Sequence, residues 1–454
     1  MPVVTATSLM ASPGGSPGVP TLVATSCGTA VAAVCALGLF EIERLLGGIW
    51  SLAAVLVAGL GCALLARVLA HLVEVVPSGA SLLAYVSRAF GRSAGIAVVA
   101  PYLLLTLFLV GAEATIVGLV VDRLLPVPML PAALAFLLIA WLVCRAGIKI
   151  GHLAQAVSTW ALIGGLGALA LVPVVGAATR GELGTRLVTS PPTVMQFVAG
   201  VGQALFLFMC FELVTAQVEV ASPRAVGRAL GRSVVILAGF YGLLALGFSC
   251  LSRTPRIPSG SFVPQLALAE EVGGTPALVL IAILTVLASF SSFTGVLLSL
   301  SRFASAVARQ GALPRRMASV EARTLVPRNA MAALLLVGMT AVVLVRFGGM
   351  LGPSILAAAV STSLTYASVV WARQRDPFAG AGRGRATRLA GAVLALGLAG
   401  FGAGVIVEAG SMWIGTLALL VVAYTCALTA ALRVPRRTRL AMAPLAGRGS
   451  AHAD

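Results

Sequence analysis

The chain has 454 residues, 59% of them hydrophobic and only 10% charged, with a formal net charge of +17 and a mean hydropathy of +1.05. Soluble domains carry about 25% charged residues, so this composition excludes a water-soluble globular protein. It predicts an all-α membrane protein that crosses the bilayer many times.

Apolar runs of about 20 residues, the length that spans a bilayer as an α-helix, recur between charged or Pro/Gly-rich breaks. We predict a disordered cytoplasmic tail at 1–20, a twelve-span domain at 21–432 and a basic cytoplasmic tail at 433–454. The twelve transmembrane helices are predicted near residues 21–41, 49–73, 94–121, 127–144, 152–176, 193–218, 230–251, 276–300, 328–346, 350–372, 388–408 and 411–432.

Basic residues indicate the orientation of these spans, because Lys and Arg are enriched in cytoplasmic loops. With the N-terminus inside, 24 of the 31 Lys and Arg residues fall in cytoplasmic segments and 7 on the other side. We therefore expect both termini in the cytoplasm. The dominance of Arg over Lys is typical of a GC-rich bacterium, so the expected location is the bacterial plasma (inner) membrane. The positive charge then faces lipid head groups, and no nucleic-acid partner is needed to explain it.

Catalytic and metal-binding patterns are missing from the sequence. Residues 14–18, GGSPG, match the GxSxG nucleophile elbow formally, but this Pro/Gly-rich stretch lacks the strand–turn–helix context that the motif needs. The three His are isolated, and the seven Cys lie in or beside apolar segments without CxxC spacing. We expect neither an enzyme nor a cofactor or metal, and the chain is expected to act as a monomer or homodimer.

Two carboxylates, Glu113 and Glu212, fall well inside predicted spans. A charged group at that depth costs about 2.5–3.5 kcal/mol on insertion scales and usually faces a bundle interior or a wet cavity. No Lys or Arg lies at a comparable depth in the sequence. Two interpretations stay open: the carboxylates contact a substrate amine or carry a coupling proton, or they hold helices together by hydrogen bonds.

Several motifs resemble those of the amino acid–polyamine–organocation (APC) transporters. Residues 206–230 are similar to the sixth span of that family, with an aromatic-rich run that leads to Glu212 and a helix end that reads Glu-x-x-x-Pro-Arg from Glu219 to Arg224. Three further stretches agree in the right order: residues 77–91, residues 145–160, and residues 299–317 followed by VPRNA at 326–330.

The resemblance implies a leucine-transporter-like fold, in which 21–176 and 193–372 form a 5+5 inverted repeat and 388–432 adds two helices. It also implies that spans one and six are broken in mid-membrane, where freed backbone groups face the substrate. The chain departs from the family where glycines are usual: span one carries Ala36-Leu37-Gly38, and span six carries Cys210. Either the substrate lacks an α-carboxylate or the site binds it less directly.

The resemblance implies a secondary active transporter that carries amino acids, amines or related small organic compounds by alternating access, coupled to protons or working by exchange. Two alternatives are kept: an exporter of a specialised metabolite on the same fold, and a transporter-like sensor or scaffold that binds without transport. Glu212 and Glu113 are the expected gating or coupling residues. The expected substrate-binding residues are Ala36, Leu37, Gly38, Glu113, Phe206, Phe208, Cys210, Glu212, Ser292 and Ser361.

Overall fold

The computed structural model describes residues 17–251, 263–375, 391, 398 and 412–433. All regular elements in these ranges are helices, and the predicted span at 388–408 lies, apart from residues 391 and 398, outside them, as do 1–16 and 434–454 of the predicted tails. The helices are α2 (Val19–Ala30), α3 (Cys35–Leu45), α4 (Gly48–Val75), α5 (Ser81–Phe90), α6 (Arg92–Leu124), α7 (Met129–Ala146), α8 (Ile148–Thr179), α9 (Leu183–Leu187), α10 (Val194–Phe206), the 3-10 helix η1 (Phe211–Glu219), α11 (Pro223–Ser249), α12 (Pro264–Arg309), the 3-10 helix η2 (Arg315–Ala318), α13 (Arg328–Gly348), α14 (Leu351–Arg375) and α16 (Trp413–Arg433).

Ten of the described segments are long and apolar enough to cross a membrane, and α2 with α3 makes an eleventh that is bent by 63°. These segments coincide with eleven of the twelve predicted spans. Large apolar side chains on the outside of the bundle are exposed, including Leu60, Ile139, Val172 and Leu336. Soluble monomers rarely expose apolar surface on this scale, so the protein is a multi-pass membrane protein.

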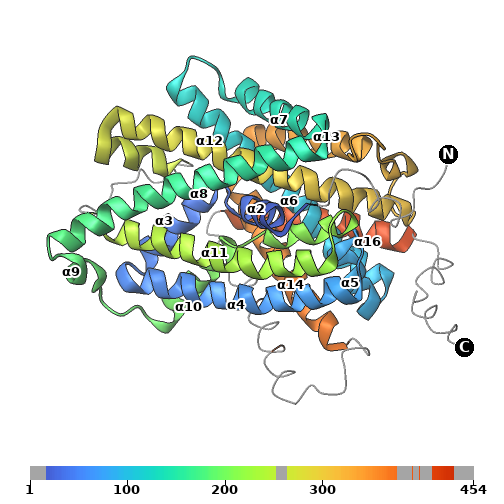
Figure 1. Ribbon diagram of the computed structural model, residues 1–454, viewed down its shortest axis with the longest axis horizontal. Coiled ribbons are helices and arrows are strands. Elements are labelled where there is room, and N and C mark those ends of the chain that lie inside the picture. The colour runs from blue at the N-terminus through green and yellow to red at the C-terminus, as the bar shows by residue number, and fades with distance from the viewer. Residues whose placement is uncertain (1–16, 252–262, 376–390, 392–397, 399–411, 434–454) are drawn as a thin grey trace, which may run out of the picture.

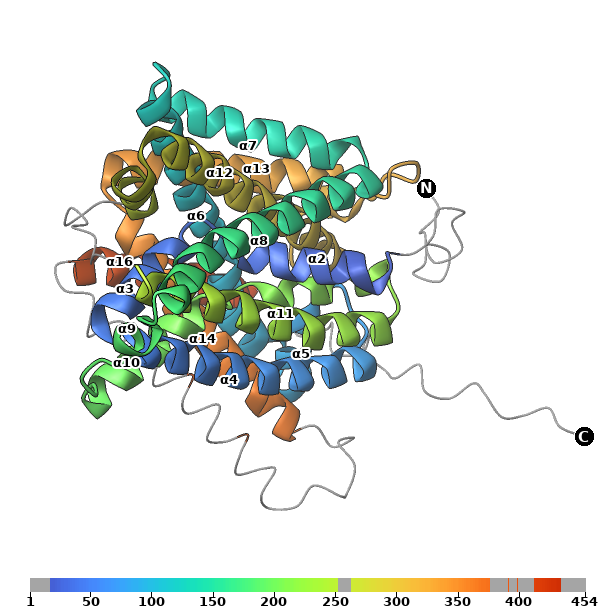
Figure 2. The ribbon, with the colours of Figure 1, turned by 60° about the vertical axis from the view of Figure 1, so that its left-hand side comes forward.

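The bent first span lies inside the bundle. Its first half, α2, packs against α8, α11, α12 and η1, whereas its second half, α3, packs against α10. Figures 1 and 2 show α2 in the middle of the molecule, with α3, α9 and α10 together at one end and α5 at the other. Because α2 meets the second half of the sixth span and α3 meets its first half, the two spans run antiparallel.

Two of the stretches that carry the family resemblance contact each other at the end of η1. The carboxylate of Glu219 pairs with the guanidinium of Arg309, near the end of α12. Ser222 then accepts a hydrogen bond from the Ala225 backbone N–H at 3.2 Å, and Pro223 occupies the first turn of α11. A Ser cap followed by Pro is a typical helix start, so this motif ends one span and begins the next.

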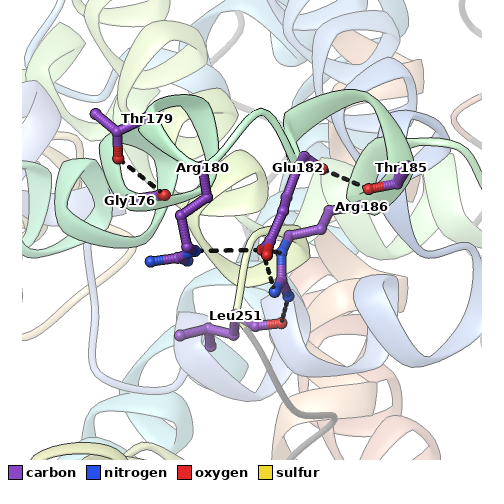
Figure 3. Close-up of polar contacts among 7 residues, drawn as sticks. All are labelled: Gly176, Thr179, Arg180, Glu182, Thr185, Arg186 and Leu251. Carbon is purple, nitrogen blue, oxygen red and sulfur yellow. Dashed lines mark hydrogen bonds and ion pairs between the residues drawn. The ribbon is translucent and has the colours of Figure 1, made fainter.

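At the α9 end of the bundle, hydrogen bonds of polar side chains connect the loop after α8 to the end of α11 (Figure 3). The carboxylate of Glu182 accepts hydrogen bonds from Arg180 at 3.3 Å and from Arg186 at 2.7 Å. Arg186 also donates to the Leu251 carbonyl at 3.0 Å, just beyond α11. The hydrogen bonds from Arg186 and Arg180 lower the pKa of Glu182 below its ordinary value.

We expect Glu182→Gln to lower the melting temperature slightly at neutral pH, and the difference from wild type should vanish on acidification. A carboxylate with a depressed pKa stabilises the fold above its unfolded-state pKa, and that stabilisation is lost as the pH falls through the folded-state pKa. Thermal unfolding of the purified protein at a series of pH values from about 7 to about 3 measures the difference. A difference that does not change with pH would contradict the assignment.

Candidate functional site

The first span is interrupted at residues 31–34, between α2 and α3. Helix breaks at membrane depth leave backbone groups that need partners. Here the N–H groups of Ala33 and Val34 donate to the two oxygens of Glu113, at 2.9 Å and 2.7 Å. The hydroxyl of Ser289 donates to the same carboxylate at 2.9 Å, and the hydroxyl of Tyr241 donates to the Ala30 carbonyl at 3.0 Å.

The sixth span is interrupted between α10 and η1, beside the first break. Cys210 adopts a left-handed backbone conformation there, with φ of 71°. Its carbonyl accepts a hydrogen bond from the Thr29 hydroxyl at 2.9 Å, and the Phe211 carbonyl accepts one from the Ser26 hydroxyl at 2.7 Å. Hydroxyls of α2 therefore satisfy the carbonyls that the second break frees, and the two breaks are held together.

The backbone at Cys210 explains why glycine is usual there. We expect Cys210→Gly to be about 1 kcal/mol more stable than Cys210→Ala, since both remove the thiol but only alanine keeps a Cβ at positive φ. Melting temperatures of the two purified variants should differ by about 2 °C.

The same two substitutions at Cys62, which is buried within the regular helix α4, form the control. There the order should reverse, because glycine in a helix interior costs about 0.5–1 kcal/mol relative to alanine. Equal stabilities of the two Cys210 variants would show that the left-handed conformation carries no strain.

A small cavity of about 20 Å³ lies between the two breaks. Roughly 10–15 Å³ by this measure is needed for one water molecule. In this conformation the cavity therefore has room for little more than one water molecule. Four predicted site residues line it: Glu113, Phe206, Cys210 and Ser292. The rest of the lining is small or apolar, and includes Thr29, Ala30, Thr106, Val110, Met209 and Val296.

A second cavity, of about 710 Å³, lies on the other side of the first break, among α3, α8, α11 and α12. Its lining is mostly apolar and reaches Arg180 and Leu251 at the α9 end. Ala32 and Cys35 line both cavities. The two spaces are therefore separated at the break by small side chains.

Glu212 lies outside both linings, fully buried near the start of η1. The hydroxyls of Tyr102 in α6 and Tyr366 in α14 each donate to one of its carboxylate oxygens. The Glu212 carbonyl accepts from the Thr215 hydroxyl at 2.7 Å, and Thr215 in turn bonds Ser81 of α5 at 2.5 Å. The Glu212 carboxylate thus joins α6, η1 and α14, whereas the Glu212 backbone carbonyl connects through Thr215 to the short helix α5.

Among the residues that the structure describes, no basic side chain forms an ion pair with Glu113 or Glu212. The six ion pairs formed within the part of the chain that the structure describes involve Glu41, Glu182, Glu219, Glu270 and Glu321. Glu113 and Glu212 are instead held by hydroxyl and amide donors. Such a carboxylate can bind a cation or take up a proton without first breaking an ion pair.

The remaining predicted site residues do not line the small cavity. Ala36, Leu37 and Gly38 are in the first turns of α3, so the freed amides are at Ala33 and Val34 instead. A Cβ on Gly38 would lie 3.1 Å from Leu207 of the second break. Phe208 is buried with its ring 5.7 Å from that of Tyr241, and Ser361 is buried in α14.

Sequence reasoning missed Tyr102, Tyr241, Tyr366 and Ser289. The chain has only five Tyr in 454 residues, and these three stand in the interior of apolar helices, where a buried hydroxyl usually finds a partner. That rarity is the signal that could have linked them to the buried carboxylates. The position of the first break had no such signal, because the stretch Val31–Val34 contains neither Gly nor Pro.

A family model described as amino acid permease matches residues 22–372. No curated protein matches the chain significantly in sequence. Solved structures of a manganese transporter from Eremococcus coleocola are similar in fold. One single-residue variant is 14% identical to this chain, with a TM-score of 0.58, and the match covers 94% of this chain and 96% of that one. A second variant is 13% identical, with a TM-score of 0.59, and the match covers 94% of both chains. A complex with an aromatic bis-isothiourea substituted compound is 14% identical, with a TM-score of 0.55, covering 94% of this chain and 92% of that one.

Proposed function

The chain belongs to the amino acid permease family, and from this premise we propose that it carries an amino acid, an amine or a related small organic compound across the bacterial plasma membrane by alternating access. The observation that carries the proposal is the pair of broken spans. Their freed backbone groups surround a small buried cavity. Glu113 lines this cavity and forms no ion pair with any basic side chain in the described part of the chain. Irregular backbone at membrane depth is tolerated where it is buried in protein or lines a cavity.

The complete domain is proposed to have twelve spans, with 21–176 and 193–372 as an inverted repeat and 388–432 as two appended helices. The antiparallel packing of the two broken spans, each the first span of its repeat, supports this arrangement. The basic residues of the connecting segments support cytoplasmic termini and an orientation with the α9 end outside. The larger cavity then offers a route from the outer side to the break, past the small residues Ala32 and Cys35.

Coupling is proposed to involve Glu212. Opening the site moves the broken spans relative to α6 and α14, which hold this carboxylate through Tyr102 and Tyr366. A carboxylate that loses hydroxyl donors in a buried position favours its protonated form. Proton uptake and release at Glu212 would therefore follow the conformational cycle, which supports symport with protons or exchange.

Uptake by the purified full-length chain in proteoliposomes tests the function. Labelled amines and amino acids are offered with and without an imposed pH gradient, and manganese is included because the structural neighbours are manganese transporters. Saturable uptake of an organic compound is expected. Accumulation only in inverted vesicles would favour the exporter of a specialised metabolite. Binding without flux in either orientation would overturn transport and favour the sensor or scaffold.

A further inference from the structure

We propose that Glu113 takes the place of a substrate carboxylate at the first break, so that the site selects amines that lack an α-carboxylate. This inference rests on the proposed function and names its substrate class. It starts from the two amides of Ala33 and Val34, which are the freed donors beside the cavity. In a transporter for amino acids, such donors are the natural partners of the substrate's carboxylate.

The geometry leaves these donors no capacity for a second anion. Each amide has one N–H, and Glu113 accepts both, one on each oxygen. Because the carboxylate bridges the two amides of Ala33 and Val34, it makes the contact that a bound amino acid would otherwise make. The hydroxyl of Ser289 gives it a third donor, and the residue is 2% exposed. The side chain is therefore fixed in the site.

Charge points in the same direction. A substrate carboxylate beside Glu113 would place two anions next to each other in a buried site, which is unfavourable unless one is protonated. An ammonium group beside Glu113 would instead be attracted to the carboxylate. Glu113 lines the cavity, and two oxygens with about four acceptor positions receive three hydrogen bonds. One acceptor position on the Glu113 carboxylate therefore remains for an N–H of a positively charged substrate.

The neighbouring polar groups fit an ammonium better than an anion. Thr29 lines the cavity, and its hydroxyl lies within hydrogen-bonding distance of three backbone carbonyls. Its single proton is therefore directed to a carbonyl and is not available to an anionic substrate. The hydroxyl of Ser292 also points to a carbonyl, that of Thr29, at 3.5 Å. The substrate inferred from these groups has a primary or secondary ammonium and a small, uncharged body.

The test compares matched pairs of ligands on the full-length protein in lipid nanodiscs. Each pair is an amine and the amino acid that yields it on decarboxylation: phenethylamine with phenylalanine, isoamylamine with leucine, and isobutylamine with valine. Binding is measured by thermal shift and by calorimetry. Wild type should bind at least one amine ten or more times more tightly than its amino acid partner. No binding of any amine, or tighter binding of the amino acids, would overturn the proposal.

Glu113→Ala frees the two amides and should abolish or reverse the preference. In this variant acetate should compete with an amino acid for the amides, but should strengthen binding of an amine by replacing the lost carboxylate. Acetate should have neither effect on wild type. An unchanged preference in Glu113→Ala would overturn the proposal.

Glu113→Gln keeps the shape of the side chain in case the alanine variant does not fold. It should weaken amine binding tenfold or more without admitting amino acids, and unchanged amine binding would count against the proposal. Flux separates this inference from the proposed function. Selective amine binding without uptake would refute transport alone, whereas uptake of amino acids in preference to amines would refute only the role of Glu113.

Discussion

Glu212→Gln is expected to reduce saturable uptake at least about tenfold and to flatten its dependence on pH. Each oxygen of the Glu212 carboxylate accepts one hydrogen bond, from the hydroxyl of Tyr102 or of Tyr366. Glutamine has one carbonyl oxygen and an NH₂ group, so one tyrosine loses its acceptor and faces a donor instead. A hydrogen bond to a charged group contributes about 1.5–3 kcal/mol, which corresponds to roughly tenfold to a hundredfold in an equilibrium constant.

The change in pH dependence separates coupling from structure. A glutamine cannot be protonated, so any step that needs proton uptake at position 212 disappears. Uptake is measured in proteoliposomes at a series of internal and external pH values. Glu321→Gln is the matched control, since Glu321 pairs with Arg328 in a partly exposed position away from both breaks. If Glu212→Gln keeps wild-type rates and pH profile, the residue serves only to join α6, η1 and α14.

The spans and their order could be predicted because the bilayer imposes one simple requirement. Each crossing needs about 20 apolar residues, and that pattern is visible in one sequence without any knowledge of packing. The break in the sixth span could be expected from the motif around Glu212. The structure has a left-handed backbone at Cys210 in this break, at the position where the resemblance indicates a departure from glycine.

The partners of the two carboxylates could not be predicted, because they depend on how distant helices meet. Glu113 lies about 80 residues from the amides that it accepts, and Glu212 lies 110 and 154 residues from its two tyrosines. Apolar periodicity says which residues are buried, but not which of them face each other. The substrate-binding role of residues 36–38 stays a prediction. The freed amides at 33 and 34 depend on a helix break that has no signal in the sequence.

Close packing around α2 supports the half-helix that ends at the first break, and it involves residues outside the predicted substrate site. Thr159 of α8 and Ser291 of α12 share a hydrogen bond of 2.6 Å over Gly28. The amide of Gln155 donates to the Ser291 carbonyl at 3.2 Å and to the Thr25 carbonyl at 3.4 Å. Small residues at such crossings let helix backbones approach closely. The half-helix that ends at the break is therefore held by polar contacts in addition to buried apolar side chains such as Leu22.

Gly28→Ala is accordingly expected to lower the melting temperature by several degrees and to reduce uptake. A Cβ at this position would lie 2.4 Å from both the Ser291 and the Thr159 hydroxyl oxygens, so the bond between them must break or α2 must move. Overpacking of this kind costs about 1–3 kcal/mol. Gly231→Ala in α11 is the control, since a Cβ at that position would have nothing within 4 Å of it, and alanine there favours the helix. If the two variants melt at the same temperature, α2 is free to shift within the bundle, and the tight crossing does not position the first break.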